Sequence, residues 1–218
     1  MAFLVLEQPT AEGYNMQITT NRSVLAATSY VYGGTTDVVF DDVDQGSLQI
    51  VYTSTIPAAK TFTDTDVTVL TSSIAIAAHG FVTGLKVSIA IAGGGTLPAG
   101  LTATDYFIIK VSAGVIKFAA TLADALAGTE VAITDDGTHD VTTITAAALA
   151  GCVCKLQATN DGTNYFDLSG LTKTITAAGN EIFPLVDKFY KALRINLAIT
   201  AGEVTLSASL FGKKYANM

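Results

Sequence analysis

Histidine is the side chain best suited to acid–base catalysis near neutral pH, and the sequence contains two histidines. His79 precedes Gly80 in a turn-like stretch, where we expect its ring to bond nearby backbone. His139 lies in residues 135–140, whose glycine and acidic residues are typical of a hairpin turn. Neither histidine belongs to a Gly-x-Ser-x-Gly nucleophile elbow or a His-Glu-x-x-His zinc motif. The sequence therefore predicts no catalytic residues and a protein that is not an enzyme.

Carboxylates and cysteines are the other groups that could hold a metal ion. The two oxygen-rich stretches, residues 41–44 and 160–164, lack the ligand spacing of a calcium loop, so we expect solvated turns. Cys152 and Cys154 are two residues apart in an apolar run, which in a strand places both on one face and favours core packing over a disulfide or a zinc site. The glycine run at 93–95 is followed by neither a Gly-Lys-Ser/Thr motif nor a helix, so it does not predict a phosphate loop. We predict no metal and no cofactor.

Composition and charge exclude several classes of partner. The 218-residue chain has a formal net charge of −7, with 12 basic and 19 acidic residues, which argues against binding to nucleic acid. Half of the residues are hydrophobic but only 14% are charged, against about 25% in a typical domain, so Thr, Ser, Asn and Gly must form much of the surface. No apolar stretch approaches the roughly 18 residues that span a bilayer, and the start lacks the features of a cleavable signal. We expect synthesis in a cytoplasm and no membrane partner.

The sequence pattern of the C-terminal third of the chain predicts a series of antiparallel strands. Residues 152–158 alternate between apolar and polar side chains, and the Asn-Asp-Gly-Thr-Asn stretch at 160–164 supplies a tight turn. Further strands are expected at residues 165–168, 171–177, 181–186, 192–199 and 203–211. Short strands at this spacing favour a sandwich or a barrel.

Two more strands are expected upstream, at residues 36–40 and 46–53. They could pair with the open edge of the C-terminal strands and close an antiparallel β-sandwich of jelly-roll or immunoglobulin-like type. Residues 24–32 fit a buried strand or a short helix equally well. The fold class predicted from these patterns is all-β.

The segment between these two regions has its own series of expected strands. Its expected strands are residues 67–70, 73–77, 86–92, 106–111, 115–119, 130–134 and 140–144. One short helix is expected at residues 121–128, with Thr121 as N-cap, Asp124 in the first turn and Gly128 just past the end. We therefore predict a discontinuous sandwich domain of residues 1–57 and 149–218, interrupted by a small, mostly β domain of residues 58–148.

Three stretches of the predicted sandwich carry a family resemblance: residues 47–52 (SLQIVY), 153–165 (VCKLQATNDGTNY) and 189–195 (FYKALRI). Their order resembles a β-sandwich module of tailed-bacteriophage virion proteins, in which an LQ-x-SNDGTNW-like hairpin precedes a YRYLRV-like strand. In this chain Thr159 stands where the module usually has Ser, and Tyr165 where it has Trp.

The inserted segment carries a second resemblance. Its stretches 79–87 (HGFVTGLKV), 95–101 (GTLPAGL), 106–109 (YFII), 116–119 (IKFA) and 123–129 (ADALAGT) are similar in order to a small module of phage tail, baseplate and decoration proteins. Such a resemblance concerns a structural module and not a chemistry.

Together the resemblances imply a structural component of a tailed-phage virion. The leading expectation is a capsid-surface decoration or auxiliary protein, made in the host cytoplasm, that assembles with the major capsid protein and with further copies of itself. One alternative is a structural protein of the neck, tail, baseplate or fibre base. Another is a carbohydrate-binding module for host adsorption.

Two kinds of side chain are expected to contact a partner. The apolar N-terminal run could add as a strand to a neighbouring sheet, or could be an edge strand of its own chain. The aromatic rings of the tyrosines in the hairpin and in the insert could stack on a sugar ring. The expected contact residues are Phe3, Leu4, Val5, Leu6, Tyr106 and Tyr165.

Overall fold

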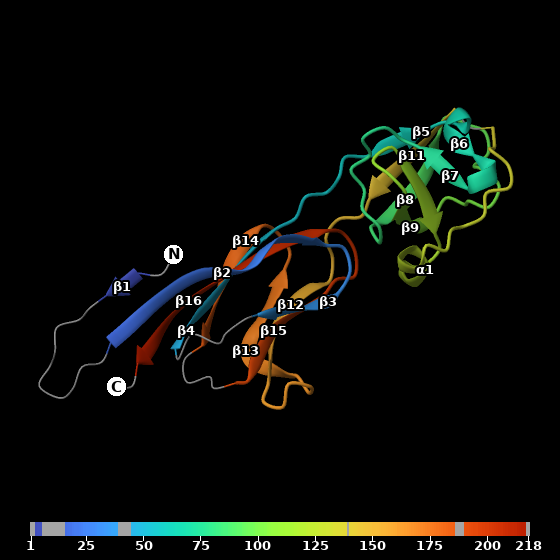
Figure 1. Ribbon diagram of the computed structural model, residues 1–218. Helices are drawn as coiled ribbons and strands as arrows, with labels where there is room; N and C mark the ends of the chain where they lie inside the picture. Colours follow the sequence, from blue (N-terminus) through green and yellow to red (C-terminus); the bar gives the residue numbers. More distant parts are fainter. Residues whose placement is uncertain (1–2, 6–15, 39–44, 139, 186–189, 217–218) are drawn as a thin grey trace, which may run out of the picture. The chain divides into compact units, whose positions relative to one another are not determined.

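The computed structural model describes residues 3–5, 16–38, 45–138, 140–185 and 190–216, and these residues form antiparallel sheets with a single short α-helix. The chain divides into two compact units (Figure 1). The sandwich unit comprises Met1–Ser54, Gly151–Ile199 and Val204–Met218, and the inserted unit comprises Thr55–Ala150 with Thr200–Glu203. The sequence predicted divisions after residues 57 and 148, and the structure has them after Ser54 and Ala150; the segment Thr200–Glu203, expected in the sandwich domain, groups with the inserted unit.

One sheet of the sandwich unit combines strands from both ends of the chain. In the described residues it has five strands in the order β1 (Phe3–Val5), β2 (Met16–Tyr30), β16 (Val204–Ala216), β4 (Gln45–Thr53) and β14 (Gly179–Leu185). Strand β4 lies between β14 and β16, so the expectation that residues 46–53 close an open edge is wrong in detail: this strand is internal. Residues 24–30 belong to β2, which excludes the helical alternative for them.

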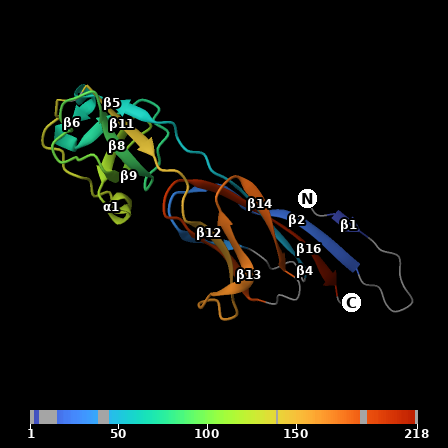
Figure 2. The same cartoon turned by 180° about the vertical axis from the view of Figure 1, so that it is seen from behind.

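The second sheet of this unit has, among the described residues, four strands in the order β13 (Phe166–Ile175), β12 (Cys152–Thr159), β15 (Ala192–Ala198) and β3 (Gly34–Val38). Figure 2 shows it from behind. The two strands expected at 165–168 and 171–177 are one strand, β13, whose pairing with β12 shifts register between Lys155 and Gln157.

The alternation of side chains builds a single core between the two sheets. Its buried members include Leu48, Ile50 and Tyr52 on β4, Cys152, Cys154 and Leu156 on β12, Leu193, Ile195 and Leu197 on β15, and Val204, Leu206 and Leu210 on β16. Two polar contacts also join the sheets: the hydroxyls of Tyr30 and Thr36 lie 2.9 Å apart, and the Lys173 ammonium lies 2.7 Å from the Glu181 carboxylate. The prediction of an all-β, sandwich-like fold is therefore confirmed.

The inserted unit has its own sheet and core. In the described residues its seven strands are ordered β5 (Lys60–Phe62), β11 (Val141–Ala146), β8 (Lys86–Ala92), β9 (Asp105–Lys110), β10 (Val115–Ala119), β7 (Ser73–Ala75) and β6 (Val67–Thr68). Two 3₁₀ turns, Asp64–Asp66 and Val69–Thr71, flank β6. Its largest fully buried side chains include Phe62, Phe81, Ile108, Ile116 and Phe118.

The predicted helix is confirmed as α1 (Leu122–Ala127). The Thr121 hydroxyl accepts a hydrogen bond from the Asp124 amide at 3.1 Å and donates one to the Asp124 carboxylate at 2.6 Å. Gly128 ends the helix with φ of 75°, a conformation that glycine adopts without steric cost.

The strand predicted at residues 130–134 is wrong. This stretch joins no ladder in the described structure and is fastened by separate bonds. The Val131 amide donates to the Phe118 carbonyl at 2.7 Å, and the Ile133 amide donates to the Ser72 hydroxyl at 3.0 Å. Within residues 130–134 only Ile133 is buried.

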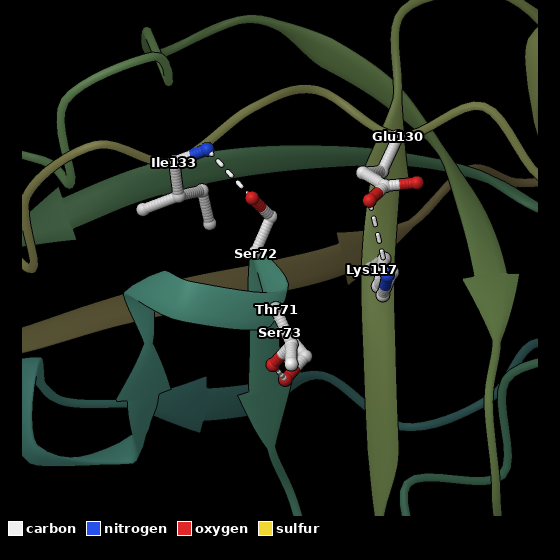
Figure 3. A network of polar contacts seen from close by, with 6 residues as sticks. All are labelled: Thr71, Ser72, Ser73, Lys117, Glu130 and Ile133. Carbon is white, nitrogen blue, oxygen red and sulfur yellow. Dashed lines mark hydrogen bonds and ion pairs between the residues drawn. The ribbon is translucent and has the colours of Figure 1, made fainter.

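An ion pair fixes the start of the same stretch (Figure 3). The Lys117 ammonium donates to the Glu130 carboxylate at 3.1 Å, and this bond holds the pKa of Glu130 below its ordinary value. Beside the Ser72 contact, the hydroxyls of Thr71 and Ser73 lie 2.8 Å apart. Side-chain contacts and single backbone hydrogen bonds thus hold this stretch in place of a ladder.

Candidate functional site

His79 is buried and bonded to backbone at both ring nitrogens. The Phe81 amide donates to its Nδ1 at 2.9 Å, so Nδ1 carries no proton in this arrangement. Nε2 then carries the proton and donates to the Ser112 carbonyl at 2.8 Å. The prediction that this ring bonds nearby backbone is confirmed, and the imidazole fixes the turn to the neighbouring loop. His139 lies outside the described residues.

The two cysteines are free thiols within the core of the sandwich unit. Burial raises the pKa of both thiols, and that of Cys154 rises to about 12, with the neighbouring Cys152 adding to the effect. A protonated, buried thiol is a poor nucleophile and a poor metal ligand. The prediction that both cysteines pack in the core is confirmed.

The hairpin between β12 and β13 is organised around the Asp161 carboxylate. It accepts hydrogen bonds from the Thr163 and Asn164 amides at 2.7 Å, from the Asn164 side-chain amide at 2.7 Å, and from the Thr159 hydroxyl at 2.8 Å. These bonds stabilise the ionised form, so the pKa of Asp161 lies far below its usual range. The carboxylate oxygens are occupied by their own loop. Residues 41–44, the other oxygen-rich stretch, lie outside the described residues.

Replacing Asp161 by Asn should change how stability depends on pH. Because the pKa of Asp161 is lowered on folding, its stabilising contribution is complete above the unfolded value of about 4 and is lost as the pH falls toward the folded value. The difference in unfolding free energy between the wild type and Asp161→Asn should therefore be largest at pH 7 and shrink below pH 4. Urea denaturation at a series of pH values measures it.

Thr163→Ala is the matched control for this prediction. Its backbone amide, which donates to Asp161, is retained, so it should keep the pH dependence of the wild type. If the difference in unfolding free energy between the wild type and Asp161→Asn is the same at pH 7 and pH 3, the lowered pKa of Asp161 is contradicted.

A closed polar network covers the outer face of the four-stranded sheet. The Arg194 guanidinium lies 3.8 Å from the ring centre of Tyr165, and its Nε donates to the Gln157 side-chain oxygen at 2.8 Å. Gln157 and Lys155 both donate to the Asp167 carboxylate at 2.6 Å. One face of the half-buried Tyr165 ring is thus covered by Arg194, and this outer face of the sandwich is charged.

The second aromatic residue expected to meet a partner faces the interior instead. Tyr106 lies on β9, is only 5% exposed and packs against Phe118 with ring centres 5.4 Å apart. Its hydroxyl accepts a hydrogen bond from the Thr102 amide at 2.9 Å. The expectation that Tyr106 contacts a partner is wrong, because the alternation of β9 directs its ring toward the core.

The N-terminal apolar run lies partly in β1. Phe3, Leu4 and Val5 pair with residues 17–19 of β2, so they form an edge strand of their own chain, which is one of the two alternatives. Leu6 lies outside the described residues.

The outer face of the five-stranded sheet is built differently, and we call the part formed by residues 47–53 of β4, 180–184 of β14 and 205–211 of β16 the uncharged face. Strand register places the following side chains together on it: Ser47, Gln49, Val51 and Thr53 of β4, Asn180, Ile182 and Pro184 of β14, and Thr205, Ser207, Ser209 and Phe211 of β16. None carries a charge. Removing such a surface from water requires no charge to be desolvated.

Three large apolar side chains project from the uncharged face into solvent. Val51 is 43% exposed, Ile182 56% and Phe211 48%. Exposed apolar side chains on a charge-depleted surface are features of the centre of protein–protein interfaces. Of the surfaces described, this is the one best suited to contact another protein.

The sequence contains a signal for these three residues, although strand alternation alone does not reveal it. Val51, Ile182 and Phe211 each follow or precede a buried apolar residue, so that two neighbouring apolar side chains point to opposite faces of the sheet. In a strand with one solvated face, the second of these should be polar.

No protein-family model matches the sequence, and no match to it is found among curated proteins. No group of three or more His, Cys, Asp or Glu side chains in the described structure could hold a metal ion. Within the same residues, no helix has the length and apolarity to cross a membrane.

Proposed function

We propose that this protein is a structural component of a tailed-phage virion, acting on the capsid surface as a decoration or auxiliary protein. The observation that carries the proposal is the uncharged face, which presents Val51, Ile182 and Phe211 among uncharged polar side chains. A surface of this kind gains free energy when it is covered by a neighbouring protein, because apolar area is buried and no ion is stripped of water.

The identity proposed for that neighbour rests on the sequence resemblances. The module around residues 153–165 and the one in the inserted unit both resemble parts of virion proteins, for which the neighbour is the major capsid protein or another structural protein. The two outer faces of the sandwich differ in a way that suits this role. The other outer face, where Lys155 pairs with Asp167 and Arg194 donates to Gln157, is charged and suited to remain in water.

Purified virions provide the direct test. Mass spectrometry should detect the chain in particles, and cryo-electron microscopy should place it on the capsid in hundreds of copies with the uncharged face toward the shell. Six or twelve copies would instead assign it to the neck, tail, baseplate or fibre base. Absence of the chain from purified particles would overturn the virion role in every form.

A charge placed on the uncharged face should weaken attachment to the particle. Ile182→Asp is expected to weaken binding to particles that lack this protein by at least tenfold, about 1.4 kcal/mol, because the carboxylate would be buried without a partner. Since Ile182 is 56% exposed, the variant should still fold. Co-sedimentation of purified variant with particles measures the change.

Thr174→Asp is the matched control for this substitution. Thr174 is exposed on β13, where it lies opposite Val153 in the four-stranded sheet. The substitution therefore adds the same charge to the sandwich unit, but away from the uncharged face. It should bind particles as the wild type does. Equal binding by Ile182→Asp and the wild type would show that this face is not the contact surface.

A further inference from the structure

The tripeptide Asp-Gly-Thr occurs twice in the chain, at residues 136–138 and at residues 161–163. In both copies the glycine has a positive φ, 80° at Gly137 and 85° at Gly162. Aspartate followed by glycine is the pair at which a backbone rearranges most readily, because glycine has no side chain to hinder attack by its nitrogen. The two copies share their sequence and their glycine conformation, so only their surroundings distinguish them.

The rearrangement converts aspartate to isoaspartate and needs no co-reactant besides water. The glycine nitrogen bonds to the side-chain carboxyl carbon and loses its proton, and the carboxyl hydroxyl leaves with that proton as water, which closes a succinimide ring. Water then adds to one ring carbonyl and breaks its bond to nitrogen, which gives aspartate or isoaspartate. The carboxyl group must be protonated before its hydroxyl can leave, and the peptide bond must turn so that its nitrogen faces the carboxyl carbon.

The Asp161–Gly162 peptide bond is held at both of its polar atoms. The Asp161 carbonyl accepts a hydrogen bond from the Lys191 ammonium at 3.1 Å, and the Gly162 amide donates one to the Thr159 hydroxyl at 3.0 Å. Turning this peptide bond toward the carboxyl carbon would break both hydrogen bonds.

The Asp161 carboxylate is held in its ionised form. Its oxygens accept four hydrogen bonds, from Thr159, Thr163 and Asn164, which place its pKa far below the usual range. Each unit by which a pKa is lowered reduces the protonated fraction at neutral pH about tenfold. The form of Asp161 that can react is therefore scarce.

Asp136 has none of these restraints. Its side chain is exposed and forms no hydrogen bond or ion pair with any described residue, and its carbonyl accepts no hydrogen bond within the same residues. The Gly137 amide donates to the carboxylate of the adjacent Asp135 at 2.8 Å. The Asp136–Gly137 peptide bond is thus held by one hydrogen bond, which is made within the same turn.

We propose that Asp136 is a site of spontaneous isomerisation in the folded chain, and that Thr159 and Lys191 suppress the same reaction at Asp161. Isoaspartate adds a carbon atom to the main chain before Gly137. Next to it, the Thr138 amide donates to the Thr96 carbonyl at 3.2 Å and the hydroxyls of these two residues lie 3.1 Å apart, so the product disturbs this contact of the inserted unit. The inference does not rest on the proposed virion role.

Ageing the purified chain in heavy-oxygen water at neutral pH tests the proposal. Each succinimide that opens takes up one heavy oxygen, whether it returns to aspartate or forms isoaspartate, and peptide mapping by mass spectrometry locates the label. Label should enter Asp136 at least about tenfold faster than Asp161, with isoaspartate accumulating at residue 136. Equal rates, or faster labelling of Asp161, would overturn the proposal.

Thr159→Val removes the hydroxyl that restrains Asp161 and Gly162 and keeps the shape of the buried side chain. It should speed labelling at Asp161 about fivefold or more and leave Asp136 unchanged. Thr159→Ser is the matched control, because it keeps a hydroxyl and should label as the wild type does. An unchanged rate at Asp161 in a folded Thr159→Val variant would overturn the role of Thr159.

The wild type in concentrated urea keeps the test decisive if Thr159→Val does not fold. Unfolding removes the surroundings of both copies, so the two labelling rates should converge to within about threefold. A difference that persists in the unfolded chain would overturn the proposal, because the cause would then be local sequence and not structure. No particle enters these measurements, so their failure is distinct from failure of the virion role.

Discussion

Leu48→Ala is expected to destabilise the sandwich unit by about 2–5 kcal/mol, a large share of the stability of a domain of this size. The Leu48 side chain is fully buried on β4, opposite Phe183 of β14 and Leu210 of β16. Truncation removes apolar contacts and leaves a cavity between strands from distant parts of the sequence. Urea denaturation of the whole chain, with hydrogen exchange of β12 and β15, measures the loss.

Gln49→Ala is the control for this prediction. Gln49 follows Leu48 on β4, but its side chain is exposed on the uncharged face. Its effect should lie within about 0.5 kcal/mol of the wild type. The inserted unit has its own core, so hydrogen exchange of β8 and β10 should not change in Leu48→Ala. Unchanged exchange in β12 and β15 would mean that β4 does not share their core.

The strands of the sandwich could be predicted where one face is buried and the other solvated. Cys152, Cys154 and Leu156 are buried while Val153 and Lys155 are not, and the turn at 160–164 follows at once. The order of strands could not be predicted in the same way. Alternation shows that residues 46–53 form a strand, but it does not distinguish an edge from the position between β14 and β16, because an antiparallel strand with one buried face has the same pattern in both.

The candidate site depends on register, which explains why the sequence did not predict it. Val51, Ile182 and Phe211 lie far apart in the chain, and only the pairing of β4 with β14 and β16 brings them onto one face. Tyr106 shows the opposite case. An aromatic residue at the start of a strand can face either side, and here it fills the core beside Phe118.

The helix α1 could be predicted fully, because each of its signals is local. Thr121, Asp124 and Gly128 act within one turn of the residues that they cap. The stretch 130–134 could not, because Ser72 and Phe118, which fasten it, are distant in sequence.

Gly100→Ala is expected to destabilise the inserted unit by about 2–4 kcal/mol, through two independent causes. Gly100 has φ of 105°, a conformation that residues with a Cβ rarely adopt. A Cβ built at this position would also overlap the carbonyl oxygen of Ala132. The backbone has no room to move away, since Ala99 exchanges hydrogen bonds of 3.0 Å with Asp135 and Thr134. Hydrogen exchange of β8 and β11 in the whole chain reports the loss.

Gly94→Ala is the control for this prediction, because it shows the general effect of replacing a glycine without the positive φ and the close contact of Gly100. No atom lies within 4 Å of a Cβ built at Gly94, and its φ is not positive. Replacing it should change stability by less than about 1 kcal/mol, with a slight gain from the smaller entropy of the unfolded chain. Similar losses in the two variants would show that flexibility, and not the close approach of Gly100 to Ala132, selects glycine in the GTLPAGL stretch.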